Sequence, residues 1–135
     1  MKMLIAVDGS EGSLQAVRHA LTLASEGLAA SFVLANVQEP ASLYEVVTAH
    51  DPDVIREVRG AAGADLLAPA EALLATAGVS FESEVTGGDP ANLIVEMAEN
   101  YGCDAIVLGG AGSVATAVLA GTSLPVTLVR MPEAE

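Results

Sequence analysis

Basic residues are scarce in this 135-residue sequence. It has 5 lysines and arginines against 18 aspartates and glutamates, for a formal net charge of −13. Nucleic acids are bound by clustered basic side chains that neutralise phosphates, and anionic membrane surfaces attract the same side chains. We therefore expect neither nucleic acid nor a membrane as a partner. The basic residues are Lys2, Arg18, Arg56, Arg59 and Arg130.

Cysteine and aromatic residues are also nearly absent. Cys103 is the single cysteine, so no disulfide can form within the chain, and a reducing compartment, the cytoplasm, is expected. Its thiol is either a small buried hydrophobe before a strand or a reactive group. The sequence is 52% hydrophobic but only 3% aromatic. The core is therefore expected to be aliphatic, with closely packed helices.

Short apolar runs alternate with helical patterns along the chain. Strands are expected over 2–7, 31–37, 79–85, 105–109 and 125–129, and the third alternates like an edge strand with one wet face. Right-handed crossovers between them give a doubly wound parallel sheet. The sequence therefore predicts one α/β domain over 1–135. The uncharged run 105–129 is long enough to span a bilayer, but its glycines and Pro125 favour a buried strand, turn, helix and strand.

The helical segments have recognisable ends. Ser10 is expected to cap the first helix, and Asp89 and Pro90 begin the third, which stops at Gly102. A fourth is expected over about 113–120. The second ends at Gly78, and Pro69 predicts that it starts late or is kinked. Its apolar stripe is predicted at Leu66, Ala70, Leu73 and Ala77. Residues 38–60 are expected to form a loop with a partial helix.

Ligands of open parallel sheets bind beyond the carboxyl ends of the strands. Asp8 follows the first strand directly. Its carboxylate is either an acceptor for a ligand's amino or hydroxyl group or an acceptor for backbone N–H groups in the turn. Gly109, Gly110 and Gly112 precede a helix, so they either help to hold an anion or form a turn that needs positive φ or close packing.

The sequence gives little indication of a catalytic site. His19, His50 and Cys103 have no spacing typical of metal ligands, and no metal site is expected. A set of Ser113, His50 and Asp8 can be drawn, but such triples arise by chance in most chains. A phosphoacceptor domain would need a lysine after the fifth strand, where Arg130 stands instead. We therefore expect a protein that is not an enzyme, with slow nucleotide hydrolysis as a lesser alternative.

Four stretches resemble the universal stress protein family: "MLIAVDGSEGSLQAVRHALTLA", "LANVQEP", "GDPANLIVEMAENYGCDAIVLGG" and "GSVATAVLAGTSLPVTLVR". They cover most of the chain except 38–60. The resemblance implies a three-layer α/β/α, Rossmann-like fold with strand order 3-2-1-4-5, a cytoplasmic stress-related role and usually a dimer. Many members bind ATP. Asp8 matches the family aspartate that helps to hold the nucleoside, and Ala6 and Val37 match positions that line the adenine.

The sequence departs from the family's phosphate loop, G-x2-G-x9-G-[ST]. Gly112 and Ser113 fall on the final G-[ST], and only one or two residues separate them from Gly109 or Gly110, where ATP-binding members have more than ten. The implied function is a non-enzymatic stress protein in which ATP binds weakly or not at all. The alternative is a pocket for an adenine nucleotide or another small ligand. Its candidate residues are Ala6, Val7, Asp8, Val37, Gly109, Gly110, Gly112, Ser113 and Val114.

The fifth strand is apolar and nearly uncharged, and such an edge invites pairing with a second copy. We expect a symmetric homodimer through this edge, and a protein partner that the sequence does not identify. The expected interface residues are Leu124, Pro125, Val126, Thr127, Leu128, Val129 and Arg130.

Overall fold

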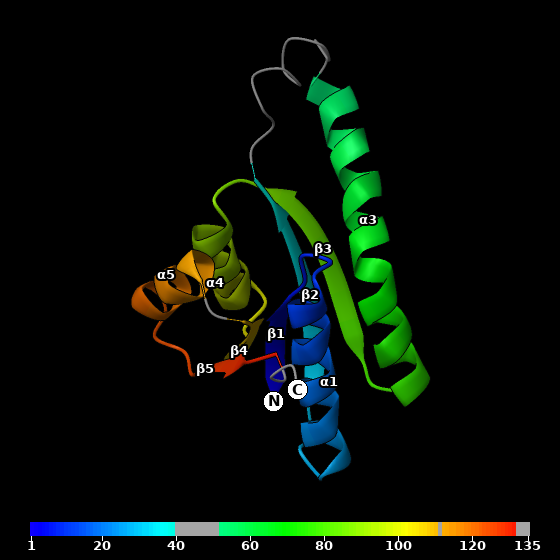
Figure 1. Ribbon diagram of the computed structural model, residues 1–135, viewed down its shortest axis with the longest axis vertical. Helices are drawn as coiled ribbons and strands as arrows, with labels where there is room; N and C mark the ends of the chain where they lie inside the picture. The colour runs from blue at the N-terminus through cyan, green and yellow to red at the C-terminus, as the bar shows by residue number, and fades with distance from the viewer. Residues whose placement is uncertain (40–51, 111, 132–135) are drawn as a thin grey trace.

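The computed structural model describes residues 1–39, 52–110 and 112–131 (Figure 1). Five strands form one parallel sheet in the order β3-β2-β1-β4-β5, and the predicted three-layer α/β fold is confirmed. The strands are β1 (Lys2–Ala6), β2 (Ser31–Gln38), β3 (Phe81–Gly87), β4 (Ala105–Gly109) and β5 (Val126–Val129).

Helices cover both faces of the sheet, as Figure 1 shows. The helices α1 (Glu11–Ser25) and α3 (Pro52–Ala77) lie on one face, while α4 (Pro90–Asn100) and α5 (Ser113–Gly121) lie on the other. Within the described ranges, no helix is both long and apolar enough to cross a membrane. The uncharged run 105–129 is divided between β4, α5 and β5, as its glycines predict.

The central strand β1 divides the core in two. Met3 and Ile5 belong to the cluster under α1 and α3, whereas Leu4 belongs to the cluster under α4 and α5. Successive side chains of a strand point to opposite faces of the sheet. All three are at most 3% exposed, so β1 is buried on both sides, as its unbroken apolar sequence predicts.

The expected caps hold α1 and α4 in place. The Ser10 hydroxyl accepts a hydrogen bond from the N–H of Ser13 (3.2 Å), and the Asp89 carboxylate accepts one from the N–H of Asn92 (3.0 Å). Each bond satisfies one of the N–H groups that a helix leaves free at its start. Gly102, with φ of 67°, follows α4 in the left-handed conformation that commonly ends a helix.

The second expected helix differs from its prediction. It does not start late: α3 runs from Pro52 to Ala77 with Pro69 inside it. Residues 52–60, where the sequence predicted a loop with a partial helix, belong to α3. Residues 40–51 lie outside the described ranges. The buried stripe is also shifted, to Leu67, Ala70 and Leu74, because α3 lies along β2 and β3. This packing outweighs the local cost of a proline, as tertiary contacts commonly do.

The two edges of the sheet carry different side chains. Edge strand β3 presents Glu82 and Glu84 among exposed or half-buried positions, and Lys2 contacts Glu82 (3.7 Å). Edge strand β5 has no charged residue within Val126–Val129, and Leu128 is 39% exposed. The predicted edge position of β3 is confirmed, but its burial does not alternate, since Glu82 and the next residue, Ser83, are both exposed. Of the two edge strands, only β3 carries the charges that discourage strand pairing.

Candidate functional site

The carboxyl ends of β1, β2 and β4 open into a cleft of about 280 Å³ on the face covered by α4 and α5. The strand ends supply its floor, and the first turns of α4 and α5 supply its walls. A cleft at this edge of the sheet is where a doubly wound fold binds its ligands. Its lining residues are Ala6, Val7, Asp8, Ala35, Val37, Glu39, Pro90, Ile94, Leu108, Gly109, Val114 and Ala115.

The structure brings most of the sequence-predicted ligand residues together here. Those that line the cleft are Ala6, Val7, Asp8, Val37, Gly109 and Val114. Gly110, Gly112 and Ser113 are not among the lining residues, although they precede or begin α5. The other lining residues were not predicted individually. Two of them, Pro90 and Ile94, had a signal, because they belong to the segment "GDPANLI" that begins α4.

Asp8 stands at the mouth of the cleft in a turn that fixes its carboxylate. Its Oδ1 accepts a hydrogen bond from the N–H of Ser10 (2.9 Å), which is the backbone role that the sequence allowed. Partial desolvation opposes ionisation, but hydrogen bonds from Ser10 and Ser13 outweigh it, so the pKa of Asp8 lies below its ordinary 3.8. Asp8 is therefore a fixed negative charge at neutral pH.

A buried polar network holds the floor of the cleft. Asn36 is 1% exposed, and its Nδ2 donates to the carbonyl oxygen of Val7 (2.8 Å). Gln38 Nε2 donates to Asn36 Oδ1 (3.2 Å) and to the carbonyl oxygen of Arg59 in α3 (3.0 Å). Because Val7 immediately precedes Asp8, this network fixes the backbone from which Asp8 extends.

The glycines between β4 and α5 have separate roles. A β-carbon on Gly109 would overlap the carbonyl group of Gly12, so β4 and α1 are in backbone contact. Gly110 has φ of +77°, and its N–H donates to the carbonyl oxygen of Val129 (2.7 Å). Gly112 is extended, with φ of 175°, and has open space around it. Close packing explains Gly109 and positive φ explains Gly110, while nothing in the structure explains Gly112.

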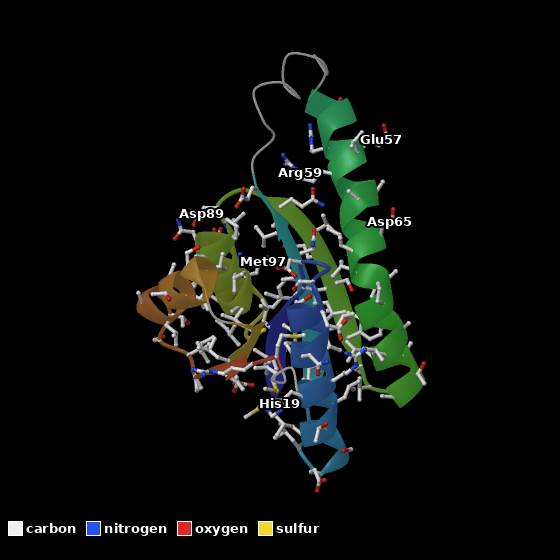
Figure 2. All side chains as sticks on the ribbon, in the orientation of Figure 1. His19, Glu57, Arg59, Asp65, Asp89 and Met97 are labelled. Atoms are coloured by element: carbon white, nitrogen blue, oxygen red, sulfur yellow. The ribbon has the colours of Figure 1, made fainter. Side chains whose placement is uncertain are left out.

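The cleft has an acidic character. Asp8 and Glu39 line it, and no lysine or arginine of the described ranges does. Figure 2 shows Arg59 and Asp89 near the same end of the molecule, on α3 and at the start of α4. The Arg59 guanidinium lies against Gly87, on the other side of the sheet from the cleft. The charge at the start of α5 is therefore limited to the helix dipole, about half a unit charge.

The structure describes some but not all of the side chains considered for catalysis and metal binding. His19 lies on α1 toward the opposite end of the molecule from Asp89 (Figure 2), and His50 lies outside the described residues. Cys103 is 7% exposed, and desolvation by burial raises the pKa of its thiol. It is therefore a small buried hydrophobe, the first of its two sequence interpretations. Where the chain is described, no group of three His, Cys, Asp or Glu residues could hold a metal ion.

Comparison with known sequences gives a consistent result. The sequence model of the universal stress protein family matches residues 1–130. A universal stress protein of Methanocaldococcus jannaschii is 31% identical, with the match covering 99% of this chain and 84% of that protein. The universal stress protein YxiE of Bacillus subtilis is 34% identical, with coverage of 82% of this chain and 79% of that protein.

Solved structures of the same kind share the fold. One of a universal stress protein family member from Burkholderia pseudomallei has a TM-score of 0.77 at 26% identity, covering 95% of this chain and 94% of that one. One of an Arabidopsis thaliana family protein with AMP bound has a TM-score of 0.76 at 22% identity, covering 98% and 92%. One from Archaeoglobus fulgidus in complex with dAMP has a TM-score of 0.67 at 20% identity, covering 96% and 97%.

Proposed function

The chain belongs to the universal stress protein family, and we propose that it is a non-enzymatic member with a shortened phosphate loop, to which ATP binds weakly or not at all. In this proposal the protein acts in the stress response of the cytoplasm through contacts with other proteins. The reducing cytoplasm suits a chain whose single cysteine is a buried free thiol.

The observation that carries the proposal is the length of the connection between β4 and α5. Gly109 ends the strand and Ser113 begins the helix, so 110–112 are all that lies between. Gly109 is packed against Gly12, and the Gly110 N–H already donates to Val129. Cradling a triphosphate needs several N–H groups that point inward from an extended loop, and this connection has few to offer.

The charge around the cleft supports the same conclusion. A triphosphate carries several negative charges, which proteins usually offset with lysine, arginine or a bound cation. Among the residues that the structure describes, none that lines the cleft is basic. The chain's net charge of −13 adds a long-range repulsion. The N–H groups in the first turn of α5 offset only a small part of the triphosphate's charge.

A second candidate function is the binding of an adenine nucleoside or a related small ligand in the cleft. Its volume of about 280 Å³ is near the lower end of the range for small-molecule sites. Ala6, Val37 and Ile94 give it apolar walls suited to a flat heterocycle, and Asp8 offers a hydrogen-bond acceptor. The AMP and dAMP bound to two proteins of the same fold favour this candidate.

Isothermal titration with Mg-ATP and with adenosine tests both candidates. We expect no ATP binding tighter than about 1 mM, a free energy weaker than about −4 kcal/mol. Low-micromolar ATP affinity would overturn the shortened-loop proposal. Adenosine binding that Asp8→Ala weakens would place the ligand in the cleft. Asp104→Ala removes an exposed carboxylate next to Lys2, at the other end of β4, and is the matched control.

We further propose that the protein is a homodimer through β5. The strand is an uncharged sheet edge, and Leu128 within it and Met131 just after it are 39% and 46% exposed. The opposite edge carries Glu82 and Glu84, which would face like charges in a symmetric pairing. Edge pairing through β5 would satisfy its free backbone groups and cover this apolar surface.

A further inference from the structure

We propose that Glu39 is a specificity-determining residue that makes the cleft accept an uncharged nucleoside and reject its phosphorylated forms. This inference rests on the second candidate function, the binding of an adenine nucleoside in the cleft. It concerns two carboxylates, Asp8 and Glu39, which follow β1 and β2 and line the same cleft.

The position of Glu39 is set by the residue before it. Gln38 lies on the α3 face of the sheet, where its amide donates to Asn36 and to the backbone of Arg59. Glu39 directly follows Gln38, the last residue of β2. The lining of the cleft includes Glu39. The buried network therefore fixes the point from which the second carboxylate extends.

Neither carboxylate is neutralised by a basic side chain among the described residues. Asp8 receives its hydrogen bond from the N–H of Ser10, and neither it nor Glu39 takes part in the ion pairs, which involve Lys2, Arg18 and Arg56. A phosphate ester with two negative charges would enter a cleft that already holds two. Both carboxylates are solvent-exposed, so their repulsion of the phosphate is screened by salt.

The N-termini of the helices near the cleft offset little of this repulsion. The first N–H groups of α1 and α4 are partly satisfied by Ser10 and Asp89, and the Asp89 cap adds a further carboxylate near the cleft. The start of α5 has no side-chain cap, and its dipole offers about half a unit charge. An uncharged nucleoside meets none of this repulsion and keeps the apolar walls and the Asp8 acceptor.

The ratio of the dissociation constants of AMP and adenosine measures this selectivity. Isothermal titration at about 20 mM salt, where charges are least screened, should give the wild-type protein at least about a tenfold preference for adenosine, which corresponds to one charge-pair energy of about 1.4 kcal/mol. In Glu39→Gln the ratio should fall to about threefold or less. The control Glu26→Gln removes the same charge at the far end of α1 and should leave the ratio unchanged.

Salt gives an independent readout of the same repulsion. Raising the salt to about 500 mM shortens the screening length to a few ångströms, so AMP should bind more tightly while adenosine hardly responds. A purely steric exclusion of the phosphate would show no such gain. Because Glu39 is exposed, Glu39→Gln should fold normally, and circular dichroism checks this.

Besides a missing salt response, three results would overturn the inference. If AMP binds to the wild type as tightly as adenosine does, the cleft has no such selectivity. Nucleoside binding in the cleft would not be contradicted by that result. An equal ratio in Glu39→Gln and Glu26→Gln would show that Glu39 does not set the selectivity. A dissociation constant for adenosine above about 10 mM is too weak for a useful affinity. It would contradict both nucleoside binding in the cleft and the role of Glu39.

Discussion

The Cα atom of Gly109 lies so close to the carbonyl group of Gly12 that no side chain fits between β4 and the first turn of α1. We expect Gly109→Ala to lower the free energy of unfolding by about 3 kcal/mol, because backbone on both sides must move to admit a methyl group. Urea unfolding at one fixed protein concentration measures the change, since self-association would make stability depend on concentration.

Two neighbouring glycines serve as controls for Gly109. Gly110→Ala should cost about 1–2 kcal/mol, because φ of +77° strains an L-residue. Gly112→Ala should cost under about 1 kcal/mol, since its φ is extended and its surroundings are open. Equal losses at all three positions would contradict the close contact between Gly109 and Gly12.

Pro69 sits on the exposed side of α3 and supplies no N–H to the helix. We expect Pro69→Ala to raise the free energy of unfolding by about 1–2 kcal/mol. The new N–H can bond to the carbonyl oxygen of Asp65 one turn earlier, while the more flexible unfolded chain takes back part of the gain. Thermal and urea unfolding should agree on the sign. A loss of stability would mean that α3 requires the proline.

Asn36 holds the end of β1 from inside the protein. Asn36→Leu should lower the free energy of unfolding by about 1–3 kcal/mol, because the buried carbonyl of Val7 loses its donor. Gln38→Leu is the matched control and should cost less, since Gln38 is only partly buried and water can replace its bonds. If both variants cost the same, the Val7 carbonyl is not what Asn36 stabilises.

The Asp8 carboxylate makes the stability depend on pH in a defined direction. Its pKa is lowered in the folded protein, so its contribution is full above the unfolded pKa and is lost as the pH falls through the folded pKa. The difference in unfolding free energy between the wild type and Asp8→Ala should therefore be constant above about pH 5 and shrink toward about pH 3. Solvent exposure keeps it below about 1 kcal/mol. A difference that grows on acidification would have the wrong sign.

The β5 edge offers a direct test of the proposed dimer. The wild-type protein should sediment as a dimer at tens of micromolar, and Leu128→Arg should shift it to the monomer, because it places two equal charges near the two-fold axis. Ser83→Arg puts the same charge on the β3 edge and should leave the dimer intact. A wild-type monomer would contradict the dimer itself, and a dimer unaffected by Leu128→Arg would place its interface elsewhere.

Sequence periodicity was sufficient for the sheet and for α1, α4 and α5, three of the four helices in the described ranges. The strands β1, β2 and β4 are buried on both faces of the sheet. Their sequences are therefore continuous apolar runs, which are easy to recognise as strands. The start of α3 was not predictable, because Pro69 and the small residues of 60–64 weaken its helical signal. Its buried side depends on β2 and β3, which are distant in sequence, and this shifted the stripe from Leu66 and Leu73 to Leu67 and Leu74.

The candidate site was predictable where it follows a strand directly. Asp8 and Val37 were found because the carboxyl ends of parallel strands meet at one edge. Glu39 gave no signal of its own, since one carboxylate among 18 acidic residues is distinguished only by its place in the lining of the cleft. The role of Asn36 was not predictable either, because it depends on a hydrogen bond to the Val7 carbonyl, 29 residues earlier in the chain.

The position of β1 has a consequence for how the protein is made. It precedes the other four strands in the chain, yet it lies in the middle of the sheet between β2 and β4. Met3 pairs with Phe32 on one side and with Ala105 on the other. On the ribosome β1 must therefore wait for about a hundred residues to be synthesised before its second neighbour exists. Contacts so distant in sequence also slow folding, so the half formed by β1, β2 and β3 should assemble first.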